Sequence, residues 1–159
     1  MNNANKENFK SVYTEPMSQG TRCRQLAEYI IFDSPLNMLC DAPTNYLKEE
    51  ECTKFITSIP TVWDETLSLN GKVSEYLAMA RKKDNVWYVG ALTNWEARDM
   101  ELDLSFLGEG EYQAEIFEDG INADRVGKDY KRKLIYLPAD KKLRIHMASG
   151  GGFIMKVQK

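Results

Sequence analysis

The spacing of hydrophobic residues changes once along the chain, at Pro60. Before this proline, apolar residues recur every three or four positions in two runs, Cys23, Leu26, Ala27, Ile30 and Ile31, and Cys52, Phe55, Ile56 and Ile59. This spacing predicts two helices that each bury one face. Thr21 is placed to cap the first helix, while Pro60 ends the second and Ala42-Pro43 breaks the chain between them.

After Pro60 the apolar residues alternate with polar ones, which is typical of strands with one wet face. The run from Val86 to Thr93 is apolar on both faces and therefore predicts a central strand. Asn70-Gly71 predicts the tight turn of a hairpin. The strands expected are 61–69, 73–81, 86–93, 100–106, 112–116, 134–137, 143–147 and 153–157. About eight successive strands without intervening helices imply a mainly β fold, an antiparallel sandwich or barrel preceded by two helices.

The change of period divides the chain into three parts. Residues 1–10 are almost wholly polar and predict a disordered tail, because they offer too little apolar surface to offset the entropy of ordering. Residues 11–60 form the helical segment, and residues 61–159 form the antiparallel β-domain.

Composition narrows the classes of partner. The formal net charge is −3 and the mean hydropathy is −0.50, so we expect a globular domain without the basic field that would attract nucleic acid. No apolar run is long enough for a membrane helix, and no signal peptide is recognisable, so we expect no membrane partner and find no localisation encoded. The three cysteines, Cys23, Cys40 and Cys52, lack the spacing of a zinc site and are expected to be small buried hydrophobes.

Catalytic chemistry has few candidates in this chain. His146 is the only histidine, which excludes a histidine-based triad or a multi-histidine metal site, and its place in the alternation predicts a solvated side chain. Glycosidic catalysis needs two carboxyl groups that face the same bond, about 5 to 10 Å apart. Asp64 and Glu65 are adjacent on a predicted strand and should point to opposite faces. We therefore assign no catalytic residue and no metal ligand.

Tryptophans offer the other candidate site. Trp63, Trp87 and Trp95 could stack on sugar rings, although Trp87 lies in the doubly apolar strand and is expected in the core. Trp95 follows that strand in a loop, so it and neighbouring aromatic residues support an alternative function as a carbohydrate-binding module.

Long stretches of the sequence resemble one enzyme family. From Glu15 the chain reads EPMSQGTRCRQLAEYIIFDSPLNMLCDAP, and it continues with PTVWDET from Pro60, EYLAMARKKDNVWYVGALTNW from Glu75, LDLSFLGEG from Leu102 and EIFEDGINADR from Glu115. These segments resemble the end of the (β/α)8 barrel and the C-terminal domain of glycoside hydrolase family 97.

The resemblance implies an accessory and structural domain of an α-glucosidase or α-galactosidase, not catalytic by itself. It implies that the catalytic carboxylates and a calcium ion belong to an N-terminal sandwich and to earlier barrel segments, which would be partners of this chain, in a parent enzyme exported to the periplasm. Trp63, Asp64 and Glu65 would then lie near the closure of the barrel or its exit, where they could touch an oligosaccharide substrate.

The resemblance also raises a question about the helices. Leu26, Ile30, Phe55 and Ile56 would lack their barrel partners in the isolated chain, so they should be covered by the β-domain, by a second copy or by nothing. A homodimer through exposed helix faces is therefore one expected assembly.

Overall fold

The computed structural model describes residues 3–34, 36–39 and 41–159. The helices are α1 (Arg22–Ile31), α2 (Pro43–Lys48) and α3 (Glu50–Thr57), and a 3-10 turn, η1, spans Ser105–Leu107. The strands are β1 (Asn3–Ala4), β2 (Ser18–Gln19), β3 (Glu65–Lys72), β4 (Tyr76–Lys83), β5 (Val86–Thr93), β6 (Arg98–Asp103), β7 (Gln113–Asp119), β8 (Tyr130–Tyr136), β9 (Lys142–Met147) and β10 (Gly152–Gln158). The mainly β fold is confirmed. None of the described helices is long and apolar enough to cross a membrane.

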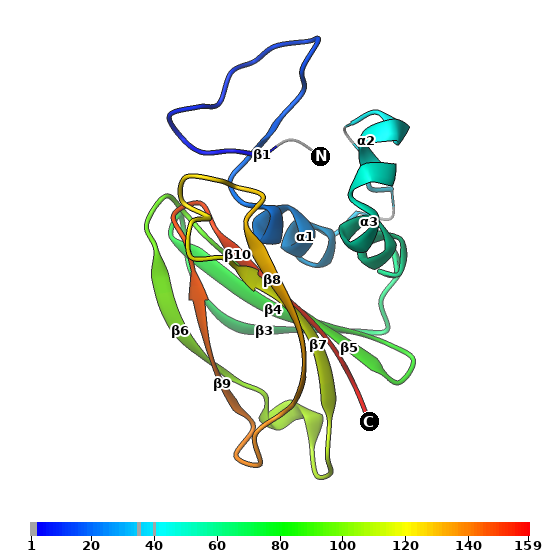
Figure 1. Ribbon diagram of the computed structural model, residues 1–159. Helices are drawn as coiled ribbons and strands as arrows, with labels where there is room; N and C mark the ends of the chain where they lie inside the picture. The colour runs from blue at the N-terminus through cyan, green and yellow to red at the C-terminus, as the bar shows by residue number, and fades with distance from the viewer. Residues whose placement is uncertain (1–2, 35, 40) are drawn as a thin grey trace.

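Three layers make up the β-domain and its helices (Figure 1). The central layer is an antiparallel sheet of six strands in the order β3-β4-β5-β10-β7-β8. The antiparallel pair β6-β9 covers one face of this sheet, and α1 and α3 cover the other. The predicted central strand is confirmed, because β5 has the predicted bounds and lies between β4 and β10.

Alternation along each strand sends side chains into two separate cores. On β10, Phe153 and Met155 pack toward β6-β9, whereas Ile154 between them packs toward the helices. On β5, Trp87 belongs to the inter-sheet core and Tyr88 to the helix-side core. The sheet is thus buried on both faces, as its doubly apolar strands require.

The helix faces are covered by the sheet. Thr21 caps α1 by accepting a hydrogen bond from the Arg24 nitrogen at 3.1 Å, as predicted. Leu26, Ile30, Phe55 and Ile56 are buried with Tyr88, Phe117 and Ile154 of the strands. Of the three coverings considered, the β-domain is the one observed. These four residues are therefore buried within the chain and are not available to a second copy.

Two features of the first 60 residues differ from the sequence prediction. Pro43 begins α2 where a chain break was expected, because proline at a first helical position loses no hydrogen bond. Asn3 and Ala4 form a parallel pair with β2, and Ala4 is buried, so these two residues are not a loose tail. Pro35 and Cys40 lie outside the described residues.

The β3–β4 hairpin turns later than predicted. Asn70 and Gly71 lie inside β3, where they pair with Ala78 and Leu77, and the chain reverses at residues 73–75 with Ser74 at a φ of 66°. A β-bulge between Ser68 and Asn70 shifts the register. The tight-turn prediction is wrong because pairing with β4 overrides the local preference of Asn-Gly. β8 likewise begins at Tyr130, earlier than predicted, because Tyr130 to Lys133 pair with β7.

Candidate functional site

The segment Trp63–Glu65 lies at the end of the sheet where the β4–β5 hairpin turns. Trp63 is half-buried, with its ring 5.3 Å from that of Tyr88 and 5.8 Å from the Arg81 guanidinium. Asp64 accepts hydrogen bonds from Lys83 Nζ and from the Asp84 nitrogen, both at 2.8 Å. The hydrogen bond from Lys83, followed by that from Asp84, lowers the pKa of Asp64. Asp64 is therefore an ionised brace of the hairpin rather than a proton donor.

Trp95 has a different environment, beside the glycine-rich turn before β10. Its carbonyl accepts a hydrogen bond from the Ser149 hydroxyl at 2.7 Å, and a side chain at Gly150 would collide with its ring. Trp95 is half-buried against this turn, so much of its ring is not open for stacking.

The structure does not bring the four predicted substrate residues together. Asp64 braces the start of β5, whereas Trp95 follows its end, and the eight residues of β5 span roughly 23 Å. Glu65 is exposed and lies opposite Lys82 in the pairing of β3 with β4. Contact of these residues with sugar stays a prediction. Because they form no common surface on this chain, the structure does not support the alternative function as a carbohydrate-binding module.

A buried carboxyl group lies elsewhere, at the junction of α1 with the glycine-rich turn. Asp119, the last residue of β7, is buried, and its Oδ2 atom accepts hydrogen bonds from the nitrogens of Ala148 at 2.9 Å and Gly152 at 3.0 Å. Burial raises the pKa of this carboxyl group. Asp119 fixes both ends of residues 148–152, and the Thr21 nitrogen donates to the Gly150 carbonyl in the middle at 3.0 Å.

Asp119 was not predicted from the sequence as a site residue. A signal was present, because Phe117 and Asp119 are two residues apart on one strand and share a face. Cys23, on the same side of the sheet, is fully buried. Burial, followed by the nearby charge of Asp119, raises the pKa of its thiol well above the ordinary value, which excludes a reactive cysteine.

Arginine side chains tie both ends of α1 to the sheet. Arg24 Nη1 donates to the Thr93 carbonyl at 2.6 Å near the start of the helix. Arg81 is buried on β4, and its Nη2 donates to the Ile31 carbonyl at 3.3 Å at the end of the helix. Gly90 lets the helix lie close to β5, since a Cβ atom there would be 3.1 Å from the Ala27 carbonyl oxygen. Both ends of the helix are therefore held against the sheet.

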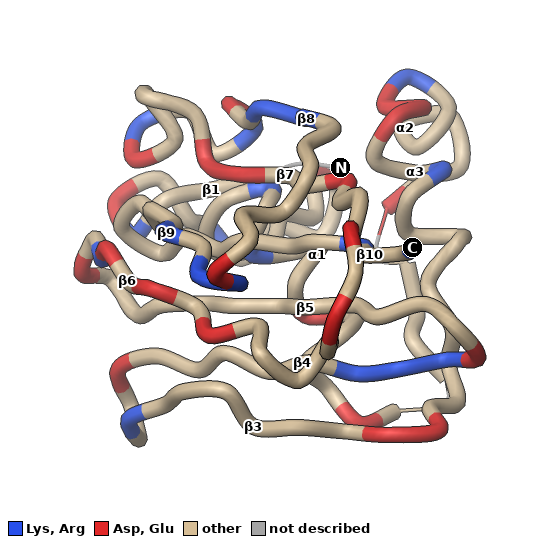
Figure 2. The backbone as a smooth tube through the Cα atoms, turned by 90° about the horizontal axis from the view of Figure 1, so that it is seen from below, with Lys and Arg blue, Asp and Glu red and all other residues tan. Residues whose placement is uncertain are grey.

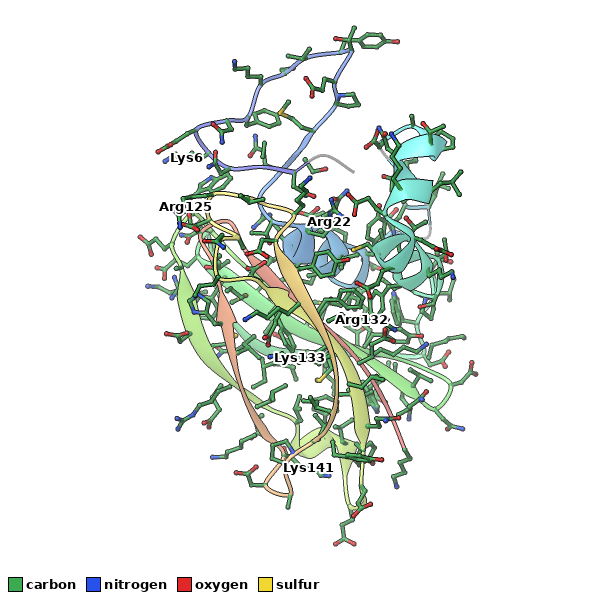
Figure 3. The ribbon with its side chains drawn as sticks, in the orientation of Figure 1. Lys6, Arg22, Arg125, Arg132, Lys133 and Lys141 are labelled. Atoms are coloured by element: carbon green, nitrogen blue, oxygen red, sulfur yellow. The ribbon has the colours of Figure 1, made fainter. Side chains whose placement is uncertain are left out.

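A second buried arginine joins the remaining parts of the helical segment (Figure 3). Arg22 is fully buried, and its Nε donates to Asn3 Oδ1 at 2.7 Å while Nη1 donates to Glu49 Oε2 at 3.1 Å. Asn3 in turn donates to Gln25 Oε1 at 3.1 Å. One guanidinium thus links β1, α1 and the junction between α2 and α3.

The helical segment also has exposed apolar residues between the end of α1 and α2. Five large hydrophobic side chains there are 41% to 81% exposed, namely Phe32, Leu36, Met38, Leu39 and Leu47. Where such side chains form a contiguous exposed patch, the patch marks an interaction surface. The described residues contain no group of three or more His, Cys, Asp or Glu side chains that could hold a metal ion.

A family model for the C-terminal, oligomerisation region of glycosyl hydrolase 97 matches residues 62–158. The chain belongs to glycoside hydrolase family 97. The matched region begins just after Pro60, so the family 97 C-terminal region corresponds to the β-domain of this chain.

Relatives extend the similarity through the helical segment. The chain is 56% identical to a retaining alpha-galactosidase of Bacteroides thetaiotaomicron over 99% of its own length, but spans only 24% of that enzyme. It is similar to the structure of a family 97 enzyme from a Pseudoalteromonas species in complex with panose, with a TM-score of 0.83 and 34% identity over 87% of this chain and 22% of the other. A beta-arabinopyranosidase shares the fold, with a TM-score of 0.75 and 24% identity over 86% of this chain and 21% of the other.

Proposed function

We propose that this chain is the C-terminal accessory unit of a larger family 97 α-glycosidase that hydrolyses α-linked galactosides or glucosides. In this proposal the β-domain associates with further copies of the enzyme, and the helical segment holds the end of the catalytic barrel against the β-domain. The 56% identity to an alpha-galactosidase favours galactosides over glucosides.

The observation that carries the proposal is that the helical segment contains both buried and exposed apolar residues. Leu26, Ile30 and Phe55 are buried on the sheet. The exposed residues, from the end of α1 to α2, are Phe32, Leu36, Met38, Leu39 and Leu47. A segment that joins two folded bodies needs apolar contacts to both, because each body must bury apolar surface to stay attached. The proposed partner of the exposed residues is the remainder of the barrel.

Catalysis in the parent enzyme is assigned to other segments. Barrel enzymes collect their catalytic groups from the ends of strands around the whole ring, and this chain supplies only the closing helices. The calcium ion expected for the family is likewise proposed to bind elsewhere in the parent enzyme, because a hard cation requires a cluster of oxygen ligands and the residues that the structure describes here form no such cluster.

The test is a hydrolysis assay with nitrophenyl α-galactoside and α-glucoside, using the purified chain alone and the chain mixed with the barrel and sandwich portion of the Bacteroides relative. We expect no turnover by the chain alone and an increase in activity or thermal stability of the barrel portion on mixing. Phe32→Ser with Met38→Ser should abolish that increase. Turnover by the chain alone, or a barrel portion indifferent to it, would contradict the proposal.

A further inference from the structure

The two edges of the six-stranded sheet differ in how they are protected. Exposed edge strands offer unpaired peptide groups, and proteins commonly block them with charged side chains, especially lysine. β8 carries Lys131, Arg132 and Lys133 in succession. β3 carries no charge from Thr66 to Gly71, and Figure 2 shows this uncharged stretch along the outer edge of the sheet between acidic residues at one end and a lysine at the other. Of the two edges of this sheet, β3 therefore has the longer uncharged stretch, residues 66–71 against 134–136 on β8.

We propose that β3 pairs antiparallel with β3 of a second copy of this chain, so that two sheets become one continuous sheet. The inference rests on the proposed oligomerisation role and specifies the surface that fulfils it. Edge pairing is a common mode of recognition, in which main-chain hydrogen bonds supply affinity and side-chain pairs fix the register.

Charge complementarity selects the register. In a two-fold antiparallel arrangement that places Glu65 opposite Lys72 of the second copy, Thr66 lies opposite Gly71 and Leu67 opposite Asn70. Each interface then contains two Glu65–Lys72 pairs. Glu65 is exposed, and Lys72 is 65% exposed while it also binds Glu75 of its own chain.

The bulge in β3 makes this register possible. Residues an odd number of positions apart normally face opposite sides of a strand, but the shift between Ser68 and Asn70 restores Glu65 and Lys72 to the same side. Glu65 pairs with Lys82, whose amine lies over the Trp87 ring of the inter-sheet core, and Lys72 pairs with Tyr76, two residues from the core residue Ala78. Both charged side chains therefore lie on the β6-β9 side of the sheet, where they can meet.

Apolar residues flank the edge at both ends. Val73 is 94% exposed and Val62 is 63% exposed. In the proposed register Val73 approaches the Trp63–Asp64 segment of the second copy. This adds apolar contact beyond the strand pairing, which a stable interface requires.

The experiment is sedimentation equilibrium of the whole chain over a wide concentration range, with charge-reversal variants at the two paired positions. We expect a dimer for the wild-type chain. E65K and K72E should each raise the dimer Kd by about tenfold, because each creates two like-charge contacts, and the double variant E65K/K72E should restore most of the affinity. Melting temperatures of all variants verify that each remains folded, and K131E on β8 is the matched control that should leave the Kd unchanged.

Each of the other possible results of this experiment would overturn a specific part of the proposal. A dimer that the β3 variants leave intact would overturn the edge pairing but not the oligomerisation role. Leu134→Ser with Tyr136→Ser, on the exposed face of β8, would then test the next surface. Weakening by both single variants without rescue by the double variant would overturn the Glu65–Lys72 register. A wild-type chain that stays monomeric would overturn the oligomerisation role of the proposed function as well.

Discussion

The Oδ2 atom of Asp119 lies 3.0 Å from the backbone nitrogen of Gly152, so a buried carboxylate at the end of β7 fixes the first residue of β10. The same oxygen binds the Ala148 nitrogen, and the three residues between these contacts include Gly150, whose carbonyl anchors α1. Asp119 thus determines where the helical segment meets the sheet.

Replacing Asp119 should have a cost that depends on the substitution. Asp119→Ala leaves two buried backbone N–H groups without an acceptor and should lower the free energy of unfolding by about 2 to 4 kcal/mol. Asp119→Asn retains one acceptor oxygen and should cost less. Urea denaturation at pH 7 measures both, and equal loss in the two variants would show that the hydrogen bonds are not responsible.

The raised pKa of Asp119 gives a pH dependence of defined sign. The folded state takes up a proton at higher pH than the unfolded state, whose carboxyl group has its ordinary value of 3.8. Asp119 therefore contributes more stability as the pH falls through the folded-state pKa, and this contribution is lost as the pH rises. The free energy of unfolding of the wild-type chain minus that of Asp119→Asn should increase between pH 7 and pH 4. A flat or falling difference would contradict this assignment.

Gly152 should tolerate no side chain. A Cβ atom there would lie 2.5 Å from the Cα atom and 2.6 Å from the nitrogen of Arg24, and backbone cannot move aside as a flexible side chain can. Gly152→Ala should destabilise the fold by about 3 kcal/mol, with amide exchange increased along α1. The control is Gly71→Ala, whose new Cβ would meet the movable end of Leu77 at 3.2 Å. If the two variants lost similar amounts of unfolding free energy, the result would argue against close packing of α1 on Gly152.

The buried Arg22 should matter far more than an exposed cation on a neighbouring helix. Arg22→Met removes hydrogen bonds to Asn3 and Glu49 and should cost about 3 kcal/mol, because Glu49 is only 30% exposed and loses its partner. Lys54→Met removes the exposed pair with Glu50 and should change stability by less than about 0.5 kcal/mol. Thermal denaturation of both variants tests this difference. Nearly equal melting temperatures for Arg22→Met and Lys54→Met would contradict the prediction.

Truncation tests whether the β-domain folds without its helices. A chain of residues 62–159 matches the family region but exposes Tyr88, Phe117 and Ile154, which the helices otherwise bury. We expect it to bind a hydrophobic dye, to aggregate and to lack a cooperative thermal transition. A monomeric, cooperatively folding truncation would show that the helix-side core is dispensable.

Periodic elements could be predicted from the sequence because burial imposes their period. The five apolar positions of α1, its Thr21 cap and the whole of β5 follow from hydrophobic spacing alone. Local signals that compete with tertiary pairing could not be read in this way. Asn70-Gly71 favours a turn in isolation, yet β4 holds both residues in a strand. Pro43 reads equally as a break or as the start of a helix.

The polar junctions could not be predicted because they join residues far apart in sequence. Asp119 and Gly152 are separated by 33 positions, and Arg81 meets Ile31 across 50. No local pattern records such contacts. The candidate substrate residues were chosen by residue type, and the structure gives Asp64 and Trp95 separate bracing positions near opposite ends of β5.

Two fully buried thiols on the helices allow the detachment of the helical segment from the sheet to be measured. Cys23 on α1 and Cys52 on α3 are both free, have 0% exposure and have pKa values that burial raises, so a thiol reagent reaches them only when a helix lifts from the sheet. In a Cys40→Ser background, their rates of modification would report separately how often each helix detaches. The two rates thus measure how firmly the helical segment is held on the β-domain.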